Sequence, residues 1–120
     1  KADPDFCVEK AGHSDSGLES RMLSLINQSK ANSEDNFFEA TDKIQDIRIM
    51  KPDWYVVRNK YTSIIERRSR VVVVVGKDAN GKCFKETVWF EQDYTGGGNY
   101  GKMYLDATSG KTTIPCMCIE

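Results

Sequence analysis

The side chains that most often perform acid–base chemistry are sparse in this chain. His13 is the single histidine among 120 residues, and its neighbours are typical of a loop, where a histidine is usually solvated. Glu86 and Glu91 are candidates for a carboxylate pair, but on one predicted strand they point to opposite faces. A glycosidase needs both carboxylates in one substrate site. The sequence therefore favours a non-catalytic protein.

Four cysteines form the second group with defined chemistry: Cys7, Cys83, Cys116 and Cys118. Their even number and spacing predict two disulfides, in which Cys7 and Cys83 each bond to one of the other two. The alternatives are free thiols in a cytosolic protein and a zinc site, although zinc ligands normally come in two close pairs. Two disulfides indicate an exported protein, secreted or periplasmic. The start at Lys1 fits a mature form after signal cleavage or a trimmed chain.

Basic side chains are the first candidate binding residues. Residues 51–70 carry six basic side chains against two acidic ones. The candidates are Arg58, Lys60, Arg67, Arg68 and Arg70, which suit an acidic partner or a phosphate group. A solvated, charged connection over residues 66–70 is the alternative. No glycine-rich phosphate cradle precedes a helix, so no nucleotide cofactor is indicated, and no metal site is predicted.

The glycine-rich segment 94–101 is the second candidate surface. Tyr94, Asn99 and Tyr100 accompany four glycines, a composition typical of a mobile recognition loop in which tyrosines supply contact area. A flexible connection between strands is the alternative. Trp89 is expected on the sheet face away from the helix, either covering a small second core or exposed as a contact anchor.

Length and charge limit the function classes. A length of 120 residues predicts one domain over residues 1–120, with an irregular segment over residues 1–15 tied by Cys7. The net charge of -1 offers no global attraction to nucleic acid or to an anionic membrane, so a protein is the better-supported partner and nucleic acid the weaker one. No apolar run reaches the roughly 18 residues that a membrane span needs.

The elements that must position these residues follow from periodicity. Ser16 and Glu19 fit a capping box, and apolar residues recur at helical spacing after them, which predicts a helix over residues 16–30. Five valines from Val71 and a β-rich run over residues 83–90 flank an Asn-Gly turn and predict a long central hairpin. Further strands are expected over residues 44–50, 54–65, 103–107 and 112–118. The predicted fold is α+β: one N-terminal α-helix packed on a curled antiparallel sheet of five or six strands.

The order of one helix followed by a curled sheet resembles cystatin-like and NTF2-like small proteins. Val72, Val74 and Gly76 are similar to part of the cystatin inhibitory pattern Gln-x-Val-x-Gly, with Val72 at the glutamine position. The resemblance implies an inhibitory or small-ligand-binding domain. A ligand pocket between helix and sheet is expected to be lined by Met22, Ile26, Phe84 or Phe90.

A second resemblance is to the fungal guanyl-specific ribonucleases and the secreted effectors built on their fold. Cys7 ahead of a helix, a following sheet and a terminal cysteine are similar. Ser69-Arg70-Val71-Val72 resembles the strand in which that family turns an arginine toward phosphate. The family's catalytic histidines have no counterpart in this chain, so the resemblance implies a catalytically degenerate member retained for binding. A weak nuclease using Arg70 and Glu86 is a further alternative.

The main hypothesis is an exported, disulfide-stabilised, non-catalytic interaction protein, such as an inhibitor, an immunity-type protein or a host-directed effector. It is expected to bind a macromolecular partner through the basic region 58–70, the segment 94–100, or both.

Overall fold

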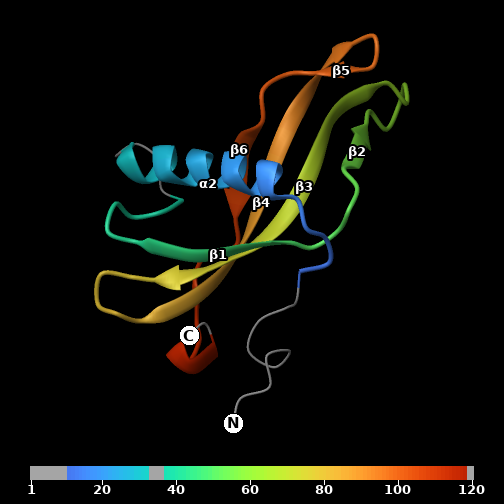
Figure 1. Cartoon of the computed structure of the whole chain (residues 1–120). Helices are drawn as coiled ribbons and strands as arrows, with labels where there is room; N and C mark the ends of the chain where they lie inside the picture. Colours follow the sequence, from blue (N-terminus) through green and yellow to red (C-terminus); the bar gives the residue numbers. More distant parts are fainter. Residues whose placement is uncertain (1–10, 33–36, 119–120) are drawn as a thin grey trace.

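The computed structural model describes residues 11–32 and 37–118, and it has one helix on one face of a curled antiparallel sheet (Figure 1). The helix is α2 (Ser16–Ala31). The seven strands found in the described residues are β1 (Lys43–Ile49), β2 (Tyr55–Arg58), β3 (Ile65–Lys77), β4 (Cys83–Gly96), β5 (Asn99–Tyr100), β6 (Tyr104–Thr108) and β7 (Thr112–Thr113). The α+β prediction is confirmed. One more strand than expected is present because β5 forms inside the segment predicted to be a loop.

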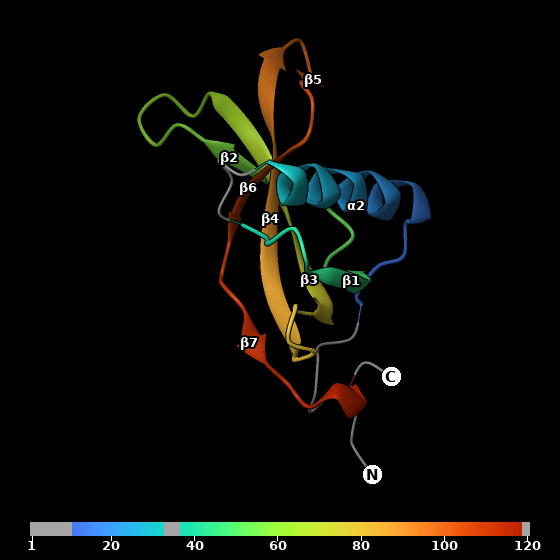
Figure 2. The same ribbon diagram turned by 90° about the vertical axis from the view of Figure 1, so that its left-hand side faces the viewer.

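Two long strands, β3 and β4, form the spine of the sheet. They pair antiparallel along nearly their whole length, which confirms the predicted central hairpin. β1 and β2 share the outer edge of β3, whereas β5, β6 and β7 lie along the other edge of β4 (Figure 2). The charged segment 66–70 belongs to β3, so it forms the outer end of a strand and not a solvated loop.

The turn between β3 and β4 is longer than the predicted Asn-Gly pair. The Asp78 carboxylate accepts hydrogen bonds from the backbone N–H groups of Asn80 (2.9 Å) and Lys82 (3.0 Å). Gly81 has a φ of 77°, a conformation that glycine adopts without steric cost. The Asp78 side chain therefore closes the turn around the predicted dipeptide.

α2 begins at Ser16 as predicted, but its cap lies one residue earlier. Asp15 has extended backbone angles, and its Oδ1 accepts a hydrogen bond from the Leu18 backbone N–H at 3.0 Å. Glu19 completes the arrangement by accepting from the Asp15 backbone N–H at 3.1 Å. An ionised cap also interacts favourably with the positive end of the helix dipole, which favours Asp15 over Ser16. Within the described residues, no helix combines the length and apolar character needed to cross a membrane.

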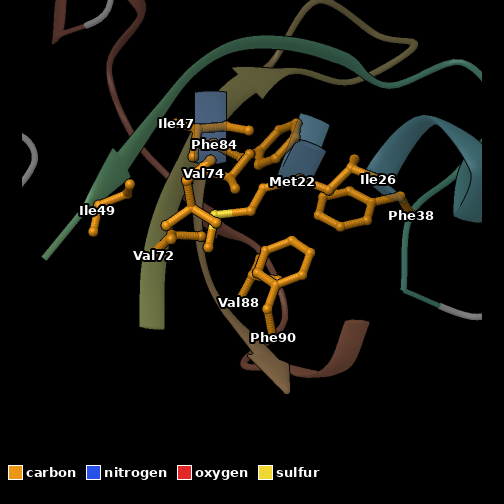
Figure 3. Packing of buried hydrophobic residues seen from close by; sticks show 11 residues of the cluster. Met22, Ile26, Phe38, Ile47, Ile49, Val72, Val74, Phe84, Val88 and Phe90 are labelled. Atoms are coloured by element: carbon orange, nitrogen blue, oxygen red, sulfur yellow. The ribbon is translucent and has the colours of Figure 1, made fainter. Parts of the chain in front are cut away.

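The main core lies between α2 and the sheet face toward it. Met22 and Ile26 of α2 pack against Val88, Phe90 and Phe84 of β4, and all five are buried (Figure 3). Even-numbered residues of both spine strands face the helix because side chains alternate along a strand. The apolar ligand pocket predicted at these residues is therefore filled by the protein's own side chains.

The partial cystatin pattern lies inside β3, where it cannot form an exposed inhibitory loop. Val72 and Val74 are fully buried in the main core. Gly76 pairs with Ile44 of β1, and a Cβ at this position would overlap the carbonyl oxygen of Lys43. The pattern therefore reflects close packing of strands.

A second, smaller core lies on the opposite face of the sheet. Val73 and Val75 pack there with Cys83 and Ile114. A disulfide joins Cys83 to Cys116 and ties the start of β4 to the C-terminal segment. This bond confirms that Cys83 pairs with one member of the Cys-x-Cys sequence.

The C-terminal segment departs from the predicted strand over residues 112–118. β7 ends at Thr113, and Cys116–Cys118 form a 3₁₀ turn, η1. Pro115 lacks a backbone N–H and cannot continue the strand ladder, which explains the early end. Cys118 is also disulfide-bonded. Cys7, for which a disulfide was predicted, lies outside the described residues, as does most of the predicted N-terminal segment.

The predicted strand over residues 54–65 is wrong in its second half. β2 ends at Arg58, and the chain then turns before it enters β3. The side-chain oxygen of Asn59 accepts hydrogen bonds from the backbone N–H groups of Tyr61 (2.9 Å) and Thr62 (3.0 Å). Local hydrogen bonds of this kind compete with strand pairing.

The glycine-rich segment 94–101 forms a β-hairpin, whereas its glycines had predicted a loop without regular structure. β4 continues to Gly96, and β5 pairs back onto it. Gly97 and Gly98 turn the chain with φ values of 61° and 82°. The Tyr94 hydroxyl accepts a hydrogen bond from the Gly98 backbone N–H at 2.8 Å. The glycines therefore supply the positive φ that a tight turn requires.

Candidate functional site

A cleft of about 500 Å³ lies between α2, the first part of β3 and the last part of β4. Near it, β2 and β5 project beyond the helix (Figure 1). Four cationic side chains, one carboxylate and several apolar groups surround the cleft. The lining residues are Asp15, Leu18, Arg21, Ser24, Leu25, Trp54, Arg68, Arg70, Gln92, Lys102 and Met103. We refer to this feature as the cationic cleft.

Arg68 of β3 contacts two aromatic rings in the cationic cleft. Its guanidinium carbon lies 4.5 Å from the ring centroid of Trp54 and 4.1 Å from that of Tyr100. Its Nε donates to Gln92 Oε1 at 2.7 Å, and Gln92 Nε2 donates to the Gly101 carbonyl oxygen at 3.0 Å. Cation–π contacts stabilise by about 0.5–1 kcal/mol each at exposed sites. The Arg68 side chain is therefore held in one orientation at the cleft wall.

Arg70 also lines the cationic cleft, but it is built into the fold. The residue is 6% exposed. Its Nε and Nη2 donate to the Lys51 carbonyl oxygen at 3.3 and 3.2 Å, and Nη2 also donates to the Pro52 carbonyl oxygen at 2.7 Å. Burial lowers the pKa of the guanidinium, while nearby carboxylates act in the opposite direction. Arg70 therefore attaches the turn before Trp54 to β3 and positions that aromatic wall.

The two remaining cations of the cleft, Arg21 and Lys102, are exposed. Among the described residues, no ion pair involves Arg21, Arg68 or Lys102. Asp15 supplies one carboxylate, which is engaged at the helix cap. Four cations against one carboxylate give the cleft a local charge of +3, although the whole chain carries -1. Such a cleft attracts anionic groups locally.

Three of the predicted binding residues come together in this part of the structure. Arg68 and Arg70 line the cleft, and Tyr100 stacks on Arg68. Tyr94 supports Tyr100, because the two rings meet edge to face with centroids 5.2 Å apart. Asn99 is exposed on β5.

Arg58 and Lys60 lie elsewhere, on the hairpin between β2 and β3. Arg58 Nη1 donates to the Ser63 carbonyl oxygen at 3.0 Å, and Lys60 Nζ lies 5.2 Å from the Tyr61 ring centroid. This hairpin and the β4–β5 hairpin project from the same end of the molecule (Figure 2). Neither Arg58 nor Lys60 lines the cationic cleft.

Arg67 and Trp89 lie on the sheet face opposite the helix. Trp89 lines a small cavity of about 250 Å³ there. Arg67 Nε lies 3.3 Å from Glu91 Oε1, and the Tyr104 hydroxyl lies 3.3 Å from the same oxygen and donates to Asp93 at 2.8 Å. Burial, followed by the interaction with Asp93, raises the pKa of Tyr104. The predicted basic region is therefore divided between the two sheet faces and a hairpin.

Sequence reasoning missed Arg21, Trp54, Gln92 and Lys102. Gln92 could have been found, because it continues the even-numbered face of β4 after Phe90. Arg21 also carried a signal, since it lies on the helix three residues after an apolar position. No local pattern marks Trp54 or Lys102, because loop packing places them at the cleft.

Glu86 lies in a different cavity, of about 380 Å³, on the same sheet face. The residue is 2% exposed, and its Oε1 has no hydrogen-bond partner within the described part of the chain. Burial raises the pKa of Glu86, while a hydrogen bond from Thr108 and the charge of Lys111 act in the opposite direction. Because Arg70 and Glu86 line separate cavities, the structure does not bring the two predicted nuclease residues into one site.

His13 makes a backbone bridge to Ile49 of β1 and does not line the cationic cleft. Within residues 11–32 and 37–118, no three histidine, cysteine, aspartate or glutamate side chains are grouped closely enough to hold a metal ion.

No protein-family model, curated protein or solved structure matches the chain. The resemblances in fold to cystatin-like proteins and to the ribonucleases therefore remain predictions, whereas the inhibitory loop and the nuclease pair are not formed among the described residues. The chemistry of the cationic cleft is that of anion binding: one preoriented guanidinium, two rim cations and an adjoining apolar wall.

Proposed function

We propose that this chain is an exported, disulfide-stabilised, non-catalytic interaction protein that binds an anionic region of a macromolecular partner in the cationic cleft. The main support for this proposal is that four cationic side chains line one cleft, and that three of them form no ion pair among the described residues. Keeping like charges together is unfavourable for folding, so such a group is best explained by a ligand that neutralises it.

The disulfide supports the exported part of the proposal. Cys83 and Cys116 are bonded, and the part of the chain that the structure describes has no free cysteine. Disulfides persist mainly in oxidising compartments. The inhibitor, immunity-type and effector classes all fit such a protein, and a protein partner is favoured over nucleic acid because the chain as a whole is slightly acidic.

The test measures binding of three fluorescent anionic polymers at physiological salt: a polyglutamate peptide, a heparin oligosaccharide and a single-stranded RNA. The cleft variant carries Arg21→Glu and Lys102→Glu, which reverse two exposed charges at the rim. The control variant carries Lys43→Glu and Lys82→Glu, which reverse two exposed charges outside the cleft. Arg70 is unsuitable for reversal, because it is buried and hydrogen-bonded to the backbone.

We expect at least one polymer to bind, with at least tenfold weaker binding to the cleft variant and nearly unchanged binding to the control. Two reversed charges next to the ligand change the binding free energy by more than about 1.4 kcal/mol, which corresponds to that factor. If no polymer binds, or if both variants lose affinity equally, the cleft is not the binding site.

A further inference from the structure

We infer that Arg68 is a preoriented receptor for a single carboxylate, and that the cationic cleft takes an acidic side chain of an extended peptide together with an apolar neighbour. This inference rests on the proposed function and narrows it to one class of ligand.

The environment of Arg68 determines which of its hydrogen-bond donors remain for a ligand. The guanidinium lies over the Trp54 and Tyr100 rings, with its carbon 4.5 and 4.1 Å from their centroids, so both rings restrain it. The Nε–H is engaged by Gln92, which is held in turn by Gly101. In the described residues no hydrogen bond involves Arg68 Nη1 or Nη2, and neither atom is among the buried polar atoms without a partner.

The outer edge of the guanidinium, formed by Nη1 and Nη2, is therefore the part that remains for a ligand. Its two N–H groups lie side by side in one plane and match the two oxygens of a carboxylate. The stacking and the Gln92 bond already hold the side chain, so little rotamer entropy is lost when a ligand binds. The same restraint excludes the side-on mode, which would need the Nε–H that Gln92 occupies.

Three features favour a peptide carboxylate over the phosphates of a nucleic acid. Arg68 covers one face of the Trp54 ring and one face of the Tyr100 ring, which reduces the aromatic surface on which bases could stack. The Asp15 carboxylate lines the same cleft and disfavours a doubly charged group. The whole chain carries a charge of -1 and does not attract a long polyanion.

The apolar part of the cleft indicates the neighbour of the acidic residue. Leu18, Leu25 and Met103 line the cleft with Arg68, and all are at least partly buried. An apolar side chain on the ligand would cover this wall and exclude water from the carboxylate contact. Exclusion of water strengthens a charge-assisted hydrogen bond.

The test uses three blocked pentapeptides that differ only at the central residue: acetyl-Gly-Leu-X-Leu-Gly-amide, with X as glutamate, glutamine or phosphoserine. Binding is followed by NMR titration of the ¹⁵N-labelled protein, including the Trp54 indole N–H and the Arg68 Nε–H. We expect the glutamate peptide to shift both signals and to bind at least tenfold more tightly than the glutamine peptide. It should also bind more tightly than the phosphoserine peptide.

Arg68→Lys keeps the charge but removes the planar pair of donors, so it should weaken binding of the glutamate peptide about tenfold. Arg67→Lys is the matched control, because Arg67 lies one position away on the opposite sheet face. If Arg68→Lys fails to fold, Gln92→Glu serves instead: it keeps the side-chain size and supplies an internal carboxylate to Arg68, so binding should be lost.

Equal binding of the glutamate and glutamine peptides, or full binding by Arg68→Lys, would overturn the carboxylate assignment. Tighter binding of the phosphoserine peptide would also overturn it. If only the RNA or heparin probe binds, and binding depends on Arg21 and Lys102, the carboxylate assignment fails while the proposed function stands.

Discussion

Replacing Arg70 with methionine tests whether this arginine supports the fold that shapes the cleft. The substitution keeps an apolar stem of similar length but removes all donors to the Lys51 and Pro52 carbonyl oxygens. A hydrogen bond from a charged group contributes about 1.5–3 kcal/mol, and the 2.7 Å bond to Pro52 belongs in that range. The two longer contacts share the Lys51 oxygen, so we count them as one weaker bond of about 1 kcal/mol.

Burial of the guanidinium opposes these contributions, as the lowered pKa of Arg70 shows. The expected net loss is therefore about 2–4 kcal/mol in the free energy of unfolding, near the upper range for a single substitution. With a urea m-value of about 2 kcal/mol/M, the unfolding midpoint should fall by about 1–2 M. The measurement is urea unfolding followed by far-UV circular dichroism and by tryptophan fluorescence, which should give coincident transitions.

Arg67→Met is the matched control. Arg67 belongs to the same strand, but it is 40% exposed in its side chain and pairs with Glu66 and Glu91 near the surface. Exposed ion pairs contribute less than about 1 kcal/mol. If Arg70→Met costs no more than Arg67→Met, the buried hydrogen bonds do not stabilise the turn before Trp54, and the structural role assigned to Arg70 is wrong.

Three further predictions concern the core, the buried carboxyl group and the disulfide. Gly76→Ala should lower the free energy of unfolding by about 1–3 kcal/mol, because the added Cβ overlaps the β1 backbone; Gly17→Ala, where the Cβ has room, should leave the melting temperature unchanged or raise it. Burial raises the pKa of Glu86, so the stability contributed by its protonated form is present below about pH 4 and is lost as pH rises through the folded-state pKa. Glu86→Gln should therefore reduce the fall of the urea midpoint with rising pH. If the midpoint falls as steeply with pH in this variant, the raised pKa of Glu86 does not cause the decline. Replacing both Cys83 and Cys116 by alanine opens a loop with a sequence separation of 33. The free energy of unfolding, measured by thermal unfolding without reductant, should fall by about 4 kcal/mol. A fall of less than about 1 kcal/mol would show that other links already restrain this loop.

The elements with strong local patterns could be predicted from the sequence. The apolar spacing after Ser16 gave the helix, and the valine run before Asn80-Gly81 gave the spine hairpin. The errors have physical causes that act over short distances. Asn59 turns the chain through its own side chain, and Pro115 ends the last ladder early.

The candidate site was harder to predict, because it depends on tertiary packing. Arg68 and Arg70 were candidates, but sequence alone did not show that Arg68 lines the cleft beside two aromatic rings whereas Arg70 is buried and hydrogen-bonded to the backbone. That difference depends on Trp54, which a turn brings beside β3. A cluster of arginines in sequence is therefore not a surface patch, since alternation along β3 sends Arg67 to the other face.

The alternation of β3 and β4 also constrains how this molecule can change over evolution. A single residue inserted inside either strand would shift every following side chain to the opposite face. An insertion between Arg70 and Val72 of β3, for example, would keep both arginines at the cleft but exchange the helix-facing valines with Val73 and Val75 of the second core. Length variation should therefore be confined to the turns, such as residues 78–82 and 59–64. The side chains on the two faces of the spine can change independently by substitution, so the lining of the cleft can vary while the disulfide-bonded face stays the same.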